Sequence, residues 1–397
     1  MLLWEYVMAK EIEGQTLREY GIRKKRIRQR KKLILSLLFL IVILAGGIFI
    51  WKLYNKSYSN YEIINTMSNE GIMAKGYVRF GYSFIKYSRD GALAYDKDKK
   101  LLWNGSYDMK NPIADVCNSY AVVADKGNKS LYIFDRKGVV NNIETIYDIV
   151  NVKIANQGVV AVLMEADKDY YIYFYNKEGN EIIHMKNNVG NAGYPIDIAL
   201  SQDGEKLVVS YMSVTKGKLS SSVAFYNFGE VGQNSTDGFV GGWDFDDIVV
   251  PKVTFLNNDR VCVFKENGIM LYAMSELPVE LYQEDFNQKI KSVLHNESYA
   301  GVVLDKDENN PRKLLLYNDA GKRVLESDLD FDYDKIYLAE NEIIMHDNLT
   351  CQIMRIDGRV KFKNVFTSNI DVFYPANNLN KYYLVNDSEV SEVLLLE

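Results

Sequence analysis

The sequence predicts an all-β protein: an eight-bladed β-propeller outside the membrane, preceded by one transmembrane helix and a short basic cytoplasmic tail. Three observations support this prediction. Leu33–Trp51 is an uninterrupted apolar run, a dense basic block stands directly before it, and from about Gly76 short strand-like runs recur with turn residues between them. The expected divisions are residues 1–32 for the basic tail, 33–53 for the helix, 54–70 for a stalk with a ring-closing strand, and 71–397 for the propeller.

The apolar run has the length of a membrane span. It carries no charge and only one weakly polar residue, Ser36. At a rise of ~1.5 Å per residue, roughly 20 apolar residues cross the ~30 Å hydrocarbon core of a bilayer. The run continues through Ile48–Trp51, past the small residues Ala45–Gly47 that would suit a cleavage site. This continuation favours an uncleaved anchor over a cleaved signal peptide or the buried helix of a soluble protein.

The basic block sets the orientation. Arg23–Lys32 is densely cationic, whereas only Lys52 and Lys56 follow the helix closely. Positive flanks stay in the cytoplasm, so the N-terminus is predicted inside and the C-terminal part outside the cell membrane. The same block is expected to attract anionic lipid. After residue 32 the chain has 37 basic and 49 acidic residues, which argues against nucleic acid as a partner.

The cysteines do not form a disulfide pattern. Cys117, Cys262 and Cys351 are odd in number, far apart and each set in an apolar strand-like run. An exported domain held together by disulfides would show an even, patterned set. We therefore expect three small core residues.

A repeat of about one propeller blade runs through the chain. Its landmark is the end of an apolar strand, usually an aromatic residue followed by Asp or Asn, and the intervals between landmarks are 39, 41, 51, 46, 45 and 39 residues. Four-stranded blades recur every ~40–50 residues. The Asx side chain is expected to start the turn after the third strand of each blade. The landmarks are Tyr95-Asp96, Phe134-Asp135, Tyr175-Asn176, Tyr226-Asn227, Tyr272-Ala273, Tyr317-Asn318 and Ile356-Asp357.

The end of the chain predicts how the ring closes. One further repeat after Ile356 reaches the C-terminus and supplies only three strands. A propeller closes its ring to remove edge strands, so a fourth strand has to come from elsewhere. Tyr61–Thr66, rich in β-branched and aromatic residues, is the predicted closing strand. A seven-bladed ring is the alternative, if the 51-residue interval holds a loop excursion.

Two stretches resemble known propeller repeats. Asp90–Trp103 resembles the repeat of PQQ-type, quinoprotein-like propellers, although its Thr-Gly pair is replaced. Ser201–Ser210 resembles the Ser-Pro-Asp-Gly-Lys repeat of TolB and WD-like propellers. The whole chain is similar to an uncharacterised family of bacterial single-pass membrane proteins with an extracytoplasmic propeller. That resemblance implies a fold and a topology and brings no site residues with it.

No motif predicts a catalytic site, a cofactor or a metal. The three histidines, His184, His295 and His346, fall in different repeats without metal-ligand spacing. Asp305–Asn310 resembles the start of a calcium loop but lacks the later Gly and Glu, so a solvated hairpin loop is expected. Asp328–Asp334 alternates acidic with apolar residues and is expected to connect two blades.

One long connection, Gly229–Asp247, is the candidate interaction loop. It exceeds the repeat by several residues and places Trp243, Asp244 and Phe245 after two glycines. Long loops carry recognition, and Trp is favoured at binding hot spots. The alternative is a Trp packed locally over the loop.

These features lead to a functional hypothesis. We expect a non-enzymatic, membrane-anchored propeller that acts as a protein-interaction scaffold in the cell envelope, because a broad rigid face occurs without a catalytic constellation. Two alternatives stay open. One is an enzyme acting on wall glycan with paired carboxylates at the funnel. The other is a ligand sensor that signals through the basic tail.

Overall fold

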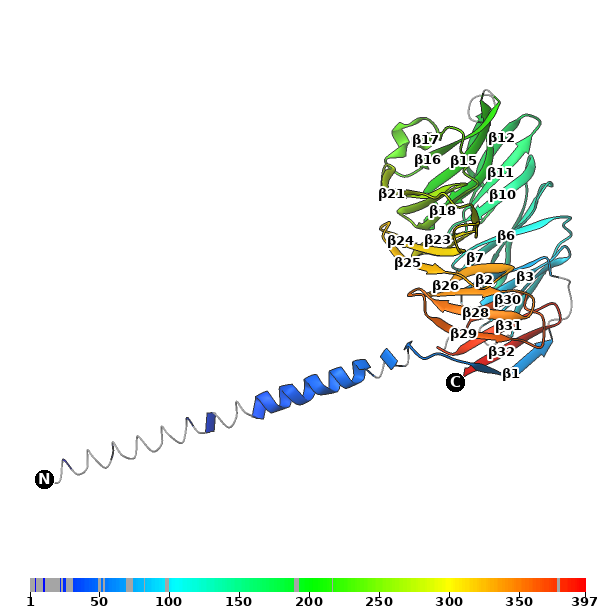
Figure 1. Cartoon of the computed structure of the whole chain (residues 1–397). Helices are drawn as coiled ribbons and strands as arrows, with labels where there is room; N and C mark the ends of the chain where they lie inside the picture. Colours follow the sequence, from blue (N-terminus) through cyan, green and yellow to red (C-terminus); the bar gives the residue numbers. More distant parts are fainter. Residues whose placement is uncertain are drawn as a thin grey trace. The chain divides into compact units, whose positions relative to one another are not determined.

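Eight four-stranded antiparallel sheets form a closed β-propeller from Tyr58 to Glu397 (Figure 1). In blades 1 to 7 the four strands follow one another in sequence, and in blade 8 the order is β1-β32-β31-β30. The first strands of neighbouring blades contact one another, as in β2 with β6 and β14 with β18, and therefore surround the central channel. The prediction of an eight-bladed, all-β propeller is confirmed, and the seven-bladed alternative is wrong.

The structure is a computed structural model that describes residues 4, 10, 22, 24–25, 31–48, 51–52, 54–68, 74–81, 83–96, 100–188, 193–215, 217–376 and 379–397. Contacts divide the chain into two units, Met1–Ser57 and Tyr58–Glu397. Most of the predicted basic block at Arg23–Lys32 lies outside the described residues.

The strands of each blade run from the channel outward. Blade 1 comprises β2(Gly76–Phe80), β3(Ser83–Tyr87), β4(Gly91–Tyr95) and β5(Leu101–Ser106), and blade 2 comprises β6(Pro112–Cys117), β7(Tyr120–Asp125), β8(Ser130–Asp135) and β9(Gly138–Glu144). Blade 3 comprises β10(Asp148–Ile154), β11(Val160–Ala166), β12(Asp169–Tyr175) and β13(Glu181–Asn188), and blade 4 comprises β14(Tyr194–Leu200), β15(Lys206–Thr215), β16(Lys218–Asn227) and β17(Phe239–Phe245). Blade 5 comprises β18(Lys252–Asn257), β19(Arg260–Lys265), β20(Gly268–Ala273) and β21(Val279–Asp285), and blade 6 comprises β22(Ile290–His295), β23(Tyr299–Leu304), β24(Lys313–Asn318) and β25(Arg323–Asp328). Blade 7 comprises β26(Lys335–Ala339), β27(Glu342–His346), β28(Thr350–Arg355) and β29(Val360–Val365), and blade 8 comprises β30(Val372–Pro375), β31(Lys381–Val385), β32(Glu389–Leu396) and β1(Asn60–Ser68). Two short 3-10 helices, η1(Gly232–Asn234) and η2(Thr236–Gly238), precede β17.

Among the described residues of the N-terminal unit, Lys31–Ile48 forms an apolar helical stretch. None of its 18 residues is buried. This length and composition fit a single membrane span or a signal sequence.

Each sequence landmark ends, or lies directly after, the third strand of a blade. Tyr95 ends β4, Tyr175 ends β12, and Ile356 follows β28. The Asx residues start the next turn as expected: Asn227 Oδ1 accepts a hydrogen bond from the backbone N–H of Gly229 at 2.9 Å. Among the described residues of the 51-residue interval, the extra length lies in the long strands β15 and β16 of a complete blade and not in a loop excursion.

The predicted closing strand is β1, the outermost strand of blade 8. It pairs antiparallel with β32 from Asn60↔Leu396 to Ser68↔Glu389, with an irregularity after Ile63. The ring of Tyr61 packs on Phe366 of the preceding inter-blade connection, with centroids 4.3 Å apart. In Figure 1 the two ends of the propeller lie side by side, as the register requires. Ring closure by the segment around Tyr61–Thr66 is confirmed.

The core consists of eight apolar clusters in the described residues, one in each gap between neighbouring blades. Strand β11 shows how one sequence fills two gaps. Val160, Val162 and Met164 belong to the cluster shared with blade 2, while Ala161 and Leu163 belong to the cluster shared with blade 4. Because side chains alternate along a strand, a buried blade needs apolar residues on both faces.

The acidic run between blades 6 and 7 has the predicted role of a connection. Leu329, Phe331 and Tyr333 are buried in the cluster that joins these blades. Arg312 Nη1 donates to Asp332 Oδ1 at 2.6 Å, which holds the pKa of that carboxyl below its ordinary value. The acidic side chains therefore lie beside the apolar contact between blades 6 and 7.

The cysteines are free thiols. Cys262 and Cys351 are fully buried, and burial raises the pKa of both. Cys117 is half-buried and donates to Asn156 Oδ1 at 3.0 Å. The first two are core residues as expected, while Cys117 lies at the end of an inner strand.

Replacing residues 60–68 by a glycine–serine linker of equal length tests the closure of the ring. We expect the free energy of unfolding to fall by several kcal/mol, on the order of what a packed strand contributes. The measurement is chemical denaturation followed by circular dichroism.

Ile64→Ala is the matched control, because Ile64 lies on the same strand with its side chain 40% exposed. It is expected to change stability by less than about 0.5 kcal/mol. An unfolding midpoint that does not move when the whole strand is replaced would contradict closure by β1.

Candidate functional site

One face of the propeller carries the turns between the first and second strands of the blades. We call it the turn face, and the central channel opens on it. In a four-stranded meander the turns between the third and fourth strands lie on the same face. In blade 8 the chain ends occupy that place, because Asn60 pairs with Leu396. The chain therefore enters the propeller at the rim of the turn face.

A cavity of about 1050 Å³ opens at the turn face. Its wall includes charged side chains from several inner strands, among them Asp115 on β6, Lys153 on β10, Lys252 on β18 and His295 on β22. The volume is at the upper end of the range that holds small molecules, about 300–1,000 Å³. The channel mouth is the candidate functional site.

Two lysine–aspartate ion pairs lie on the wall of this cavity. Lys153 Nζ donates to Asp115 Oδ1 at 3.1 Å, and Lys252 Nζ lies 3.4 Å from Asp197 Oδ2. Each aspartate also accepts a backbone N–H from the neighbouring blade, Ile154 N for Asp115 and Val253 N for Asp197, both at 3.0 Å. These backbone bonds fix the carboxylates, and the carboxylates in turn position the lysines.

His295 lines the cavity at the end of β22 and is exposed there. Its Nδ1 lies 3.4 Å from the hydroxyl of Thr254. Burial, then the charges of Lys252 and Lys153, lower its pKa to about 4, and Asp115 opposes this only in part. The pKa of Lys153 is raised, first by the charge of Asp115. At neutral pH the imidazole is therefore neutral in a positive local potential.

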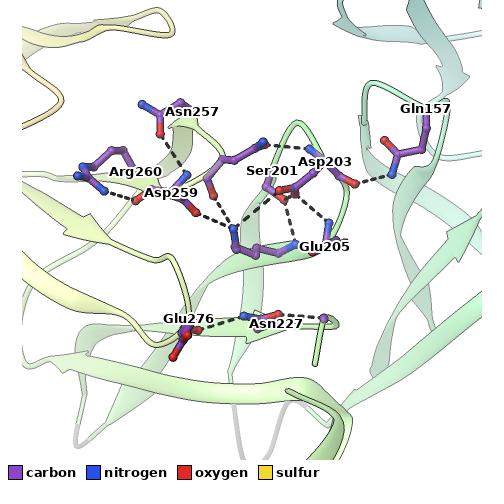
Figure 2. A network of polar contacts seen from close by, with 12 residues as sticks. Gln157, Ser201, Asp203, Glu205, Asn227, Asn257, Asp259, Arg260 and Glu276 are labelled. Atoms are coloured by element: carbon purple, nitrogen blue, oxygen red, sulfur yellow. Dashed lines mark hydrogen bonds and ion pairs between the residues drawn. The ribbon is translucent and has the colours of Figure 1, made fainter. Parts of the chain in front are cut away.

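The turn of blade 4 is bonded to both neighbouring blades (Figure 2). The backbone N–H of Asp203 donates to Asn258 Oδ1 at 2.9 Å, and Lys206 Nζ donates to Asp259 Oδ1 at 2.8 Å. On the other side Gln157 Nε2 donates to the carbonyl of Asp203. The residues that resemble the TolB and WD-like repeat thus join blades 3, 4 and 5.

Similar bonds extend this connection across the turn face. Asn118 donates to Asn156, which links blade 2 to blade 3. Gln202 Nε2 donates to Glu297 Oε1 at 3.1 Å and joins blade 4 to blade 6. Blade 6 is joined to blade 7 by Asn296 Nδ2, which donates to the carbonyl of Glu340 at 2.8 Å.

The last bond of the series returns to blade 1. Arg79 Nη2 donates to Glu340 Oε1 at 2.7 Å. The turns of blades 1 to 7 thus form one connected polar set, which we call the turn network. It surrounds the cavity mouth and fixes the positions of the turns relative to one another.

A second cavity of about 500 Å³ lies at the opposite end of the channel, among blades 7, 8 and 1. Tyr77, Tyr87, Asp371 and Asp387 are among its lining residues. Burial, then the charge of Asp387, raise the pKa of Asp371. The fully buried Lys86 has a lowered pKa because of its burial, which the two carboxylates oppose.

The predicted interaction residues are not in a loop. Trp243, Asp244 and Phe245 lie on β17, the outermost strand of blade 4, where Val223 pairs with Trp243. The loop prediction was wrong because η1 and η2 take up the extra residues, while Gly241 and Gly242 continue the strand. The Trp243 ring packs on Tyr272 of blade 5 with centroids 4.7 Å apart, and Asp244 is exposed. An interaction role for the three residues stays a prediction.

The other sequence candidates have separate positions. His184 is exposed on β13 and stacks on Tyr173, and His346 is buried on β27. Asp307 Oδ1 accepts the backbone N–H groups of Asn309 and Asn310, both at 2.8 Å, so the Asp305–Asn310 loop is bonded to itself. Among the described residues, no group of three His, Cys, Asp or Glu side chains is placed to hold a metal ion.

Sequence reasoning missed Lys153, Lys252 and His295 as a set. They belong to blades 3, 5 and 6 and share no local motif. Lys153 and His295 lie near the end of the first strand of their blades, whereas Lys252 begins the first strand of blade 5, so the three residues share no position in the repeat that could have marked them.

The architecture defines a β-propeller protein, and solved structures share it. BamB from Moraxella catarrhalis matches with a TM-score of 0.51 and 11% identity, over 85% of this chain and all of that chain. Sqt1 from Saccharomyces cerevisiae matches with a TM-score of 0.51 and 14% identity, over 86% of this chain and 99% of that chain. At these identities the likeness is one of fold.

The family is shown by sequence. Residues 54–395 match the family described as a family of unknown function, DUF5711, and the chain belongs to that family. Among curated proteins, none shows significant similarity to this chain.

Gly204→Ala tests the turn network. Gly204 has a φ of +74°, and an added Cβ would lie 2.7 Å from Gln157 Nε2 and 3.1 Å from the Cβ of Ala155. The left-handed backbone costs about 1 kcal/mol for Ala. Displacing Gln157 is expected to cost about 1 kcal/mol more, because its bond to blade 4 is lost. The measurement is the free energy of unfolding in urea.

Gly127→Ala separates the two effects. Gly127 has a φ of +81° with no atom within 4 Å of an added Cβ, so it carries the backbone cost alone. Equal losses for the two variants would contradict a stabilising contact between the turns of blades 3 and 4.

Proposed function

We propose that this protein is a non-enzymatic, single-pass membrane protein that displays its propeller outside the cell as a scaffold for protein partners in the cell envelope. The observation that carries the proposal is the turn network, which joins the turns of seven blades into one surface. A surface that is ordered before binding loses little conformational entropy when a partner docks. Several blades can then contribute contacts at once.

The membrane part of the proposal rests on the apolar helix and its flank. Lys31–Ile48 has the length and composition of a span, and Arg23–Lys32 precedes it. The basic flank favours a cytoplasmic N-terminus and contact with anionic lipid. The proposed divisions are a tail at 1–32, a span at 33–53, a stalk and closing strand at 54–70, and the propeller at 71–397.

A projecting hairpin in blade 4 is the proposed second contact for a protein partner; it joins the second and third strands of the blade and therefore lies on the face opposite the turn face. Strand β14 pairs with β15 only as far as Met212, and β17 pairs with β16 only back to Ser221. The hairpin continues beyond both neighbours and exposes Val214 and Leu219, which are 68% and 48% exposed. Exposed apolar side chains on a projecting ordered element suit a protein interface.

The proposed contact with a protein partner also includes the residues predicted from the sequence, Trp243, Asp244 and Phe245. Phe245 pairs with Ser221 at the base of the projecting hairpin, and Asp244 is exposed next to it. Trp243 packs inward and supports this strand from behind. We propose that Asp244 and Phe245 extend the contact surface of the hairpin while Trp243 fixes their position.

One observation favours a second candidate function, an enzyme acting on wall glycan. Asp371 has a raised pKa and shares a cavity of about 500 Å³ with Asp387 and several tyrosines. A carboxyl group whose pKa is raised by burial, placed beside a second carboxyl, resembles the pair of acids in a glycosidase.

Crosslinking in intact membranes followed by affinity capture tests the scaffold. We expect a specific protein to be captured by the native chain and its yield to fall at least tenfold with Leu219→Asp. The charge would have to be buried against the partner, which costs several kcal/mol, on the order of two decades in affinity. Quantitative mass spectrometry of the captured proteins is the readout.

Val139→Asp is the matched control, because Val139 is 49% exposed on the outer strand of blade 2. It is expected to leave capture unchanged. Recovery of lipid alone by the native chain would contradict the scaffold. Release of sugar from wall glycan by the purified protein, lost in Asp371→Asn, would establish the enzyme instead.

Protease treatment of intact cells stripped of their wall tests the topology. We expect the propeller to be digested and the segment before the helix to be spared, because the basic flank holds it in the cytoplasm. The products are followed with tags at the two termini. Protection of the C-terminal tag together with loss of the N-terminal tag would reverse the orientation.

A further inference from the structure

The cavity at the turn face is less acidic than the propeller around it. Residues 58–397 contain 35 basic and 49 acidic residues. Arg79, Arg136, Lys153 and Lys252 line the cavity together with Asp115, Glu297 and Glu340, and Asp197 faces Lys252, so basic and acidic side chains are balanced there. Basic groups are therefore enriched in this cavity relative to the rest of the propeller, and an anion small enough to enter the channel can contact them.

Three nitrogen donors reach this cavity from different sides of the ring. Lys153, Lys252 and His295 come from blades 3, 5 and 6, and all three line it. A planar carboxylate is recognised best by the coplanar fork of an arginine, whereas lysines act as separate point donors. Donors arriving from several directions fit the oxygens of a tetrahedral anion.

The lysines retain donors for a ligand although each has an aspartate partner. An ammonium group has three N–H donors. Lys153 uses one on Asp115, Lys252 faces Asp197, and their side chains remain 24% and 33% exposed. The aspartates are held by backbone N–H groups of the next blade, so a ligand need not displace them.

His295 supplies the third donor when it binds a proton. Its Nδ1 is beside the Thr254 hydroxyl, and its Nε2 has no hydrogen-bond partner among the described residues. The charged groups around it are Lys252 on β18, Lys153 on β10 and Asp115 on β6, while Glu340 after β26 lines the same mouth. An anion bound here would oppose the effect of the lysines and raise the pKa of the imidazole from about 4.

We propose that the channel mouth at the turn face binds a small tetrahedral oxyanion, a phosphate group or its analogue, between Lys153, Lys252 and His295. The phosphate group belongs either to free inorganic phosphate or to the head of a phosphorylated small molecule. Binding is coupled to proton uptake by His295, so affinity increases as the pH falls below neutral.

The test uses the full chain in nanodiscs of phosphatidylcholine, with sulfate as the first probe because its charge is constant between pH 5 and pH 8. The chain has only three histidines, so imidazole resonances report the site directly. We expect sulfate to shift His295 and to leave the exposed His184 and the buried His346 in place. Calorimetry is expected to show tighter sulfate binding at pH 5 than at pH 8.

Two lysine substitutions provide the matched comparison. Lys252→Gln is expected to weaken sulfate binding roughly tenfold or more, since a charge-assisted donor is lost. Lys186→Gln removes a lysine that is likewise paired with an aspartate, Asp169, on the outside of blade 3, and is expected to change nothing. His295→Gln is expected to remove the pH dependence and keep part of the affinity.

Other probes identify the source of the phosphate group. Stronger binding of inorganic phosphate than of glycerol 3-phosphate indicates the free ion, and the reverse order indicates a phosphorylated molecule. Acetate binding as tight as sulfate would overturn the assignment of a tetrahedral anion. Equal shifts of all three histidines, or an unshifted His295 in the native protein, would overturn the site even if Lys252→Gln failed to fold.

Discussion

Closure of the ring is the constraint on which the other features depend. Without β1, blade 8 would have only three strands, and the N–H and C=O groups along one side of β32 would be unpaired. Pairing of β1 with β32 supplies the missing strand of blade 8, and Tyr61 then packs against the neighbouring apolar cluster. Only in a closed ring do the inner strands from separate blades surround one channel, so the turn network and the charged mouth both follow from this pairing.

Apolar and charged residues have separate roles in the same blades. Middle strands such as β11 bury alternate side chains in two different clusters, which accounts for the stability of the ring. The inner strands present one edge to the channel and place charged side chains there. Asp115 and Asp197 bridge neighbouring blades through backbone N–H groups as well as lysines. These polar groups are satisfied across blade boundaries, so they also fix how adjacent blades are rotated.

Much of the fold could be predicted because blades repeat along the chain. Tyr95, Tyr175 and their equivalents mark third strands, and the shortage of one strand after Ile356 pointed to the closing segment. The conformation of Trp243–Phe245 could not be predicted, because two glycines are as typical of a loop as of a tightly packed outer strand. The channel residues share no local pattern. Lys153, Lys252 and His295 meet only through the geometry of the ring, which single-sequence spacing does not encode.

The register of Asn60 with Leu396 also determines when the fold can be completed during synthesis. The first strand of the propeller to leave the ribosome pairs with the last, so β1 has no partner in its own blade until synthesis is complete. Contacts this distant in sequence form slowly, because a long loop has to close before they are gained. A chain that stops a few residues early keeps most of its blades and still has an open ring. Its two exposed edges would distinguish it from the finished protein for proteases and chaperones.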